Sequence, residues 1–142
     1  MPSQMLYVST AVGPMTTAVT GTILRSAQAH NAAHGITGVL CQGRGVYLQI
    51  LEGEKSTIES LYARIVLDKR HHNVVLRQQQ DITRRRYGNW AMAHVDMSHL
   101  EHAEAESSHH TMFNPYLAAA DELMAKIDAL IAAGKMINSP VE

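Results

Sequence analysis

The chain has 142 residues, enough for one domain with a buried core, and its composition of 46% hydrophobic and 18% charged residues excludes an intrinsically disordered protein. Its single cysteine, Cys41, excludes an internal disulfide and a metal site built from several cysteines. The net charge of −1 hides an asymmetry, because residues 1–95 carry ten basic and five acidic residues whereas residues 96–142 carry two and eight.

The first half of the chain begins with a strand-like run at residues 6–10, which Gly13-Pro14 ends. Thr16 or Thr17 then occupies the capping position of a helix that we expect to end before Gly35. Two further strands, joined by the turn Gln42-Gly43-Arg44-Gly45, are predicted at residues 36–41 and 46–51.

The next segment, Ser56-Thr57-Ile58-Glu59, matches a capping box and predicts the start of a second helix. Two more strands are predicted at residues 73–76 and 87–95. The order β-α-β-β-α-β-β predicts an α+β fold, a ferredoxin-like sandwich in which two helices cover one sheet.

After residue 95 the pattern changes. A polar, His-rich stretch at residues 98–110 precedes a helix predicted over residues 117–133. Its apolar face consists of Leu117, Leu123, Met124, Ile127, Leu130 and Ile131. We expect residues 1–96 to form the domain, and residues 97–142 to form a helical extension that is no independent domain and that buries this face on its own domain or on a second subunit.

Spacing alone predicts no catalytic or metal site. His30 and His34, and likewise His99 and His102, lie one helical turn apart, but no carboxylate or cysteine completes a ligand set, so we expect no metal. Cys41 lies within a strand and is expected to be a packed, inert thiol. The run Arg84-Arg85-Arg86 comes without a nucleic-acid-binding module and indicates a solvated strand end. We therefore expect neither nucleic acid nor a membrane as a partner, and a cytoplasmic location.

Five segments carry a more specific signal. They are Leu6-Tyr7-Val8-Ser9, Asn31 with Gly35-Ile36-Thr37-Gly38-Val39-Leu40, Tyr47-Leu48-Gln49-Ile50-Leu51-Glu52-Gly53, Asp68-Lys69-Arg70-His71, and Trp90-Ala91-Met92. Together and in this order they resemble the BLUF family of blue-light sensors that use flavin, over roughly residues 5–95. The resemblance implies the same ferredoxin-like fold, with a flavin between its two helices: FAD, with FMN or riboflavin as alternatives.

The resemblance also implies a photochemical centre in which Tyr7, Gln49 and the flavin are joined by hydrogen bonds. A phenol is oxidisable, so Tyr7 is expected to give the excited flavin an electron and then a proton. A primary amide both donates and accepts hydrogen bonds. Gln49 is therefore expected to end with rearranged hydrogen bonds, through rotation or tautomerisation. Trp90 and Met92, on the last strand, match the pair that relays this change.

Seven further positions match residues that surround the flavin in the family. From the first helix come Ile23 beside the ring, His30, and Asn31, whose amide holds the pyrimidine edge. From the second helix and the segment after it come Arg64 and Asp68 on the C2 carbonyl side, and Arg70 and His71 near the ribityl and phosphate end. On spacing alone, Arg64 and Asp68 would form an i, i+4 surface ion pair.

The chain departs from the family at two of these neighbouring positions. Ala27 stands where relatives commonly carry a serine, and Tyr87 stands where the usual residue is phenylalanine.

These features favour a blue-light photoreceptor that is not an enzyme. Its output is expected to pass through the helix at residues 117–131, within a homodimer or higher homo-oligomer, to a downstream signalling protein of unknown identity. The alternative is a ferredoxin-like protein-interaction module without photochemistry, which would bind no flavin but form the same dimer. A small acyl-phosphate hydrolase on this fold would need an arginine in the loop Thr10-Ala11-Val12-Gly13-Pro14, which has none.

Overall fold

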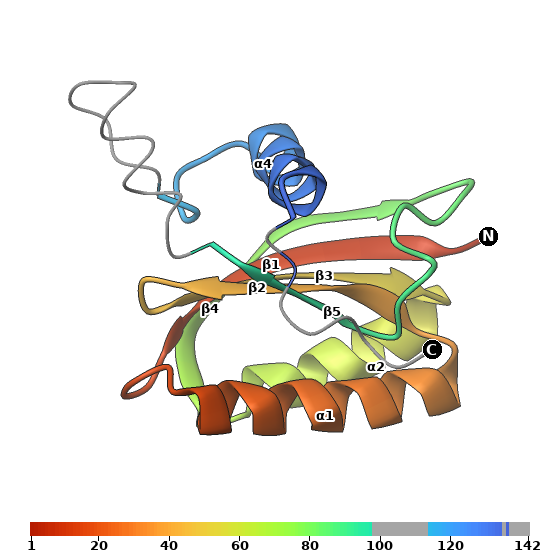
Figure 1. The fold of residues 1–142 in the computed structure, drawn as a ribbon. Coiled ribbons are helices and arrows are strands. Elements are labelled where there is room, and N and C mark those ends of the chain that lie inside the picture. The colour runs from red at the N-terminus through yellow and green to blue at the C-terminus, as the bar shows by residue number, and fades with distance from the viewer. Residues whose placement is uncertain (98–113, 135, 137–142) are drawn as a thin grey trace.

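The computed structural model describes residues 1–97, 114–134 and 136. Its centre is one sheet with the strand order β4-β1-β3-β2-β5 (Figure 1). The strands are β1 (Ser3–Ala11), β2 (Thr37–Gly43), β3 (Val46–Gly53), β4 (His71–Asp81) and β5 (Ala93–Asp96). Neighbouring strands pair antiparallel except β2 and β5, which are parallel.

Helices lie on both sides of this sheet. In Figure 1, α1 (Thr17–His34) and α2 (Lys55–Val66) cover one face, and α4 (Ala120–Ala132) lies over the other. We call these the α1–α2 face and the α4 face. The order of strands and helices is the predicted one. No helix in the described part of the chain is long and apolar enough to cross a membrane.

Strand side chains alternate between the two faces, so the sheet separates two apolar clusters. The cluster on the α1–α2 face contains Met5, Leu24, Ile36, Leu40, Tyr47, Leu51, Ile58 and Met92. The cluster on the α4 face contains Leu6, Val8, Val39, Cys41, Leu48, Ile50, Tyr87, Ala93, Val95, Met97, Leu123, Met124 and Ile127. The first cluster positions the candidate site, and the second anchors the C-terminal helix.

The predicted C-terminal helix exists but begins later than expected. Leu123, Met124 and Ile127 of α4 are buried against the sheet, so the helix packs on its own domain. Leu117, however, is 81% exposed, and its assignment to the apolar face was wrong. The reason is a separate turn, in which the carbonyl of Asn114 accepts the N–H groups of Leu117 and Ala118, both at 3.0 Å.

The predicted end signals hold for the first helix and fail for the second. The Thr16 hydroxyl accepts the N–H of Val19 at 3.1 Å, and Gly35 ends α1 with φ of +68°, a conformation that favours glycine. The capping box at Ser56 was wrong, because α2 already begins at Lys55. Its N-cap is Glu54, whose carboxylate accepts a hydrogen bond from the Ser56 hydroxyl at 3.0 Å.

The last two strands also differ from prediction. β4 extends over residues 71–81 instead of 73–76, and β5 covers only residues 93–96 instead of 87–95. Side chains distant in sequence bind the backbone groups that a longer last strand would use for pairing. The carboxylate of Glu52 accepts the backbone N–H groups of residues 86 and 87, and side-chain amides of α1 donate to the backbone carbonyls of residues 91 and 92. Trp90 and Met92 therefore lie in a loop before β5, which corrects their predicted place on the strand.

Candidate functional site

A cavity of about 280 Å³ opens between α1, α2 and the sheet. This is near the lower end of the range for small-molecule sites. All the residues predicted to contact a cofactor line it: Tyr7, Ile23, His30, Asn31, Gln49, Arg64, Asp68, Arg70 and His71. Together with Leu40 of β2, these residues bring segments from both helices and four strands around one space.

Seven further residues line the cavity that were not predicted as site residues: Ser26, Ala27, Leu40, Tyr47, Leu61, Ile65 and Leu67. Two signals in the sequence identify two of them. Tyr47 lies two residues from Gln49, so strand alternation places both on one face. Ala27 lies four residues from Ile23 and from Asn31, so helix periodicity places it between them.

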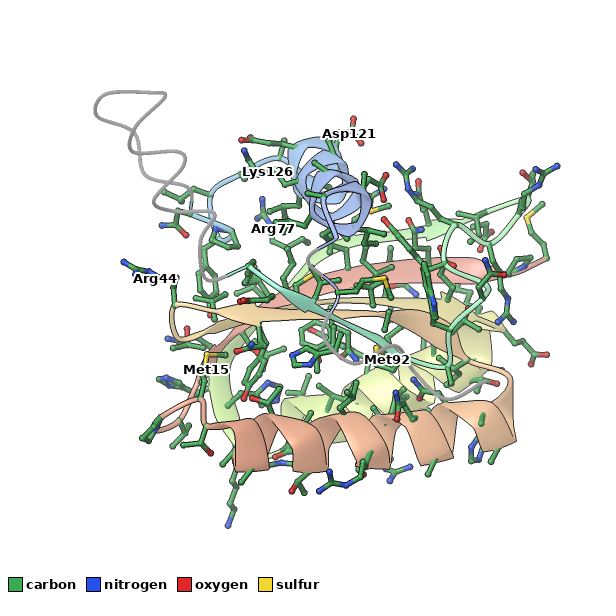
Figure 2. The ribbon with its side chains drawn as sticks, viewed as in Figure 1. Met15, Arg44, Arg77, Met92, Asp121 and Lys126 are labelled. Atoms are coloured by element: carbon green, nitrogen blue, oxygen red, sulfur yellow. The ribbon has the colours of Figure 1, made fainter. Side chains whose placement is uncertain are left out.

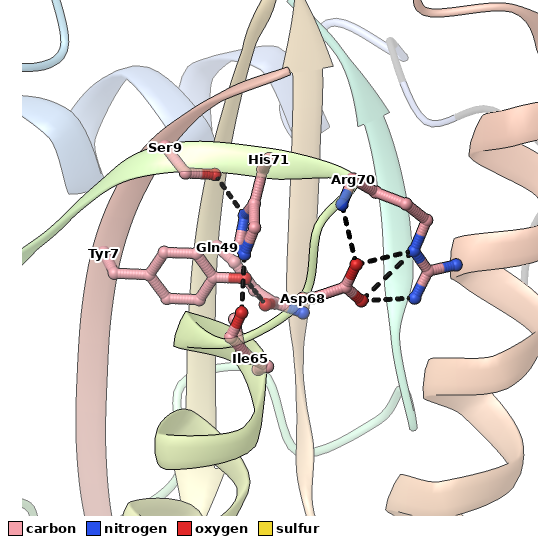
Figure 3. A network of polar contacts seen from close by, with 7 residues as sticks. All are labelled: Tyr7, Ser9, Gln49, Ile65, Asp68, Arg70 and His71. Atoms are coloured by element: carbon pink, nitrogen blue, oxygen red, sulfur yellow. Dashed lines mark hydrogen bonds and ion pairs between the residues drawn. The ribbon is translucent and has the colours of Figure 1, made fainter. Parts of the chain in front are cut away.

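The floor of the cavity holds a pair of polar side chains from adjacent strands. Tyr7 of β1 and Gln49 of β3 are direct partners in the antiparallel register, so their side chains emerge next to each other on the α1–α2 face. The buried Tyr7 hydroxyl donates a hydrogen bond to Gln49 Oε1 (Figure 3). On its other side, Gln49 Nε2 donates to the sulfur of Met92 at 3.4 Å.

These contacts fix both ends of the Gln49 amide, but unequally. A phenol is a good donor, whereas a thioether is a weak acceptor. The amide nitrogen is therefore the end of Gln49 that a stronger acceptor in the cavity would most easily take over.

Tyr7 is held as a neutral phenol. Burial raises its pKa far above the usual value for tyrosine, and the neighbouring Tyr62 and Asp68 act in the same direction. The Tyr62 ring lies 5.6 Å from the Tyr7 ring, and the His71 ring meets it edge-on at 6.4 Å. The phenol therefore keeps its proton at physiological pH and shares it with Gln49.

The α1 side of the cavity contains two polar atoms without a protein partner in the described part of the chain. Asn31 is 1% exposed; its Nδ2 donates to the carbonyl of Ala91 at 2.8 Å, but its Oδ1 has no hydrogen bond. His30 Nε2 lies 3.1 Å from Arg64 Nη1 and must accept from it, because a guanidinium only donates. Neutral His30 then carries its proton on Nδ1, which is also buried and unpaired. One free acceptor and one free donor at a cavity wall indicate a polar ligand.

At the mouth of the cavity, both the side chain and the backbone N–H of Arg70 donate hydrogen bonds to the carboxylate of Asp68. Arg70 Nε and Nη2 lie 3.1 and 2.5 Å from Asp68 Oδ2, and the Arg70 N–H donates to Oδ1 at 2.9 Å. The hydrogen bond from the Arg70 side chain is the main reason that the pKa of Asp68 is lowered. The i, i+4 ion pair of Arg64 with Asp68 expected from spacing was wrong, because α2 ends before Asp68 and Arg64 contacts His30 instead.

His71 connects this mouth to the floor. Its Nε2 lies 2.6 Å from the carbonyl of Ile65, so Nε2 must donate, and neutral Nδ1 accepts from the hydroxyl of Ser9 at 2.8 Å (Figure 3). Both nitrogens are occupied by protein groups, which orients the ring beside Tyr7.

Met92 and Trp90 lie on different sides of the sheet. Met92 is fully buried next to Gln49, between the sheet and α1 (Figure 2). Trp90 packs against the apolar cluster of the α4 face and does not line the cavity. Of this pair, Met92 is therefore the one in contact with the floor of the cavity.

The remaining candidates from the sequence are Cys41 and the histidine pairs. Cys41 is buried in a strand, which confirms that its thiol is packed, and burial raises its thiol pKa. The rings of His30 and His34 stack at 4.2 Å. Within the described ranges no three metal-ligating side chains gather, while His99, His102 and the stretch at residues 98–110 lie outside those ranges.

Comparisons with known proteins agree on one protein family. The family model for BLUF, sensors of blue light using FAD, matches residues 3–93. Photoactivated adenylate cyclase subunit alpha from Euglena gracilis is 40% identical over 85 residues, which are 60% of this chain and 8% of that protein. The chain thus spans less than a tenth of the length of the curated relative.

Two solved structures extend the likeness beyond the family model. BlsA in its ground state superimposes with a TM-score of 0.82 at 25% identity, covering 100% of this chain and 95% of the other. A bacterial light-regulated adenylyl cyclase matches with a TM-score of 0.66 at 28% identity, covering 94% of this chain and 34% of the other. The ferredoxin-like α+β fold predicted from the sequence is confirmed by these structures.

Proposed function

This chain belongs to the BLUF family of blue-light sensors, and on that premise we propose that it binds a flavin in the cavity between α1, α2 and the sheet and responds to light there. FAD is the first candidate, because the family is described as using it; FMN and riboflavin share the same ring.

The observation that carries this proposal is the unpaired Oδ1 of buried Asn31, together with the unpaired Nδ1 of His30, which lines the same cavity. The pyrimidine edge of a flavin presents an N–H flanked by carbonyl oxygens, so it offers both a donor for Asn31 and an acceptor for His30. Ile23 and Leu40 supply apolar surface for the flat ring. The residues present therefore fit a flavin.

A bound flavin would supply light absorption and, once excited, a strong demand for an electron. Tyr7 is the residue placed to meet that demand. Loss of an electron makes a phenol strongly acidic, and the Tyr7 proton already lies in a hydrogen bond to Gln49 Oε1. Transfer of this proton to Gln49 Oε1 removes the contact that sets the present orientation of Gln49, whose side-chain nitrogen is held by the Met92 sulfur alone among the described residues. Gln49 then reorganises, by rotation or tautomerisation, and Met92 is the first residue to lose a partner.

Residues 1–96 act in this proposal as the sensor and residues 97–142 as an accessory extension, which carries the change to a partner protein in the cytoplasm. The sensor itself catalyses no reaction. The relatives named as light-regulated cyclases support a protein as the recipient of the signal, and a homodimer is the proposed assembly.

The test is the absorption spectrum of flavin-reconstituted protein before and after blue light. The wild type should be yellow and show a reversible red shift. Tyr7→Phe should stay yellow and lose the shift, because phenylalanine has no oxidisable hydroxyl. Tyr47→Phe is the matched control, because this second phenol lines the same cavity but has no hydrogen bond to Gln49 among the contacts of the described residues.

A colourless protein after reconstitution would contradict flavin binding and favour the interaction module. A normal shift in Tyr7→Phe would remove Tyr7 from the role of donor.

A further inference from the structure

The loop between β4 and β5, residues 82–92, is held from both faces of the sheet. Near its end, on the α1–α2 face, Gln28 Nε2 donates to the carbonyl of Met92 at 3.1 Å and Asn31 Nδ2 to that of Ala91 at 2.8 Å. The loop therefore ends at the cavity wall, directly beside Gln49.

In its middle, the same loop is fixed by a buried carboxylate on the α4 face. Glu52, with 0% exposure, accepts the N–H of Arg86 at 3.0 Å and the N–H of Tyr87 at 2.7 Å. Gln4 Nε2 donates to the same carboxylate at 2.7 Å. This arrangement sets the direction of the Arg86 and Tyr87 side chains.

Both of those side chains reach Asp128 on α4. The Tyr87 hydroxyl donates to Asp128 Oδ1 at 2.8 Å, and Arg86 Nε donates to Oδ2 at 3.1 Å, with a second contact from its Nη2. Glu52 on β3 thus binds the backbone of Arg86 and Tyr87, and Asp128 on α4 binds the side chains of the same two residues.

The two contacts with Asp128 differ in strength. The side chains of Arg86 and Asp128 are 50% and 38% exposed, and ion pairs between side chains as exposed as these contribute little to stability. Tyr87 is buried, and loss of the partner of a buried hydroxyl destabilises the protein by the full desolvation free energy of that hydroxyl. The hydroxyl of Tyr87 is therefore the contact that specifies how α4 sits relative to the loop.

Among the described residues, further side-chain hydrogen bonds join the C-terminal segment to β1 and β4, outside the loop. Tyr116 Oη lies 2.6 Å from Thr10 Oγ1 on β1 and donates to the carbonyl of Asn73 on β4 at 2.9 Å. Arg77, also on β4 and labelled in Figure 2, donates from Nη2 to the carbonyl of Ala118.

We propose that the hydrogen bond between Tyr87 and Asp128 is the contact through which α4 responds to the state of Gln49, with Tyr87 as a positioning residue. The inference rests on the photoreceptor function proposed above. A change at Gln49 and Met92 displaces the end of the loop, and Tyr87, five residues earlier, transmits the displacement to α4. A phenylalanine at this position would lack the hydroxyl that reaches Asp128.

Hydrogen exchange of residues 120–132 in the flavin-loaded protein, in darkness and under blue light, tests the proposal, with the absorption spectrum recorded in parallel. In the wild type, exchange in α4 should differ between the two conditions. Tyr87→Phe should keep the red shift, speed dark exchange in α4 by about fivefold, the equivalent of one hydrogen bond, and lose the difference between dark and light. Tyr116→Phe is the matched control: it also removes a hydroxyl that anchors the C-terminal segment, but it should keep the difference.

Asp128→Asn separates the hydrogen bond from the ion pair. Asparagine still accepts from the Tyr87 hydroxyl but cannot pair ionically with Arg86, so the light response of α4 should survive.

Three results would overturn the proposal: an unchanged light response in Tyr87→Phe, an equal loss in Tyr116→Phe, or no light response of α4 in a wild type that shows the red shift. A wild type without the red shift would instead contradict the proposed function itself, and the inference with it.

Discussion

Three N–H groups converge on the carboxylate of Glu52, and all three come from segments distant in sequence. Hydrogen bonds to an ionised acceptor are stronger than neutral ones, and they compensate for the burial of the charge. At the scale of single residues, Glu52 is therefore a structural carboxylate that fixes the middle of the loop at residues 82–92, whereas Asn31 has an unpaired acceptor that a ligand can use.

Glu52→Gln should lower the free energy of unfolding by about 1–3 kcal/mol, because one end of the amide would turn an N–H toward another donor. Urea denaturation measures this. Glu59→Gln is the control, since Glu59 is exposed and accepts one hydrogen bond from Gln79; it should cost less than about 0.5 kcal/mol. Equal losses in the two variants would contradict the role given to Glu52.

At the scale of elements, α4 is bound to the sheet by a small number of apolar side chains. Leu123 has 0% exposure and Ile127 has 1%, whereas Leu117, three residues before the helix, is 81% exposed. Leu117, the first residue predicted for the helix, therefore contributes nothing to the packing of α4 on the sheet.

Leu123→Ala should lower the free energy of unfolding by about 2–5 kcal/mol, because it leaves a cavity between α4 and the sheet. The same substitution at Leu117 should change stability by less than about 0.5 kcal/mol. Urea unfolding of both variants provides the comparison. A similar, small effect in both would mean that α4 does not pack on this sheet in solution.

Elements were predictable where the signal is local. Hydrophobic periodicity and the cap at Thr16 gave α1, and the glycine turn gave the hairpin of β2 and β3. The short β5 was not predictable, because its start depends on Glu52, Gln28 and Asn31, which lie 34 to 64 residues away from the groups they bind. The pairing of Asp68 with Arg70 depends likewise on where α2 ends.

The residues predicted to contact a cofactor lie around one cavity, although several element bounds differ from the predicted ones. Tyr7, Gln49 and Asn31 are unremarkable as single residues; their family resemblance, spread over five segments, placed them in one cavity. Resemblance did not indicate on which side of the sheet Trp90 would lie, because a loop residue follows no strand alternation.

At the scale of the whole molecule, the charge asymmetry between residues 1–95 and 96–142 is partly resolved within the chain by the contact of Arg86 with Asp128. A second whole-molecule property is the dependence of stability on pH. His94 on β5 is only 6% exposed, and burial lowers its pKa below the usual 6.5, with Asp96 acting in the opposite direction. The unfolded chain therefore binds a proton at His94 more readily than the folded chain.

It follows that the contribution of His94 to stability is complete above its unfolded pKa and is lost as the pH falls below it. The wild type should lose more unfolding free energy between about pH 7.5 and about pH 5.5 than His94→Gln does. Urea denaturation at both values, with the exposed His72→Gln as control, measures the difference. Equal slopes for wild type and His94→Gln would contradict the prediction.

The strand order has a consequence for how the protein is made. β1 is the first strand to leave the ribosome, yet its neighbours are β3 and β4, so its last partner is complete only at residue 81. At about 5–20 residues per second, roughly 4–14 s separate the synthesis of residue 11 from that of residue 81. Throughout that interval Met5, Leu6 and Val8 have no complete sheet to join. The strand that carries Tyr7 is thus the one that the nascent chain must keep from aggregating for longest.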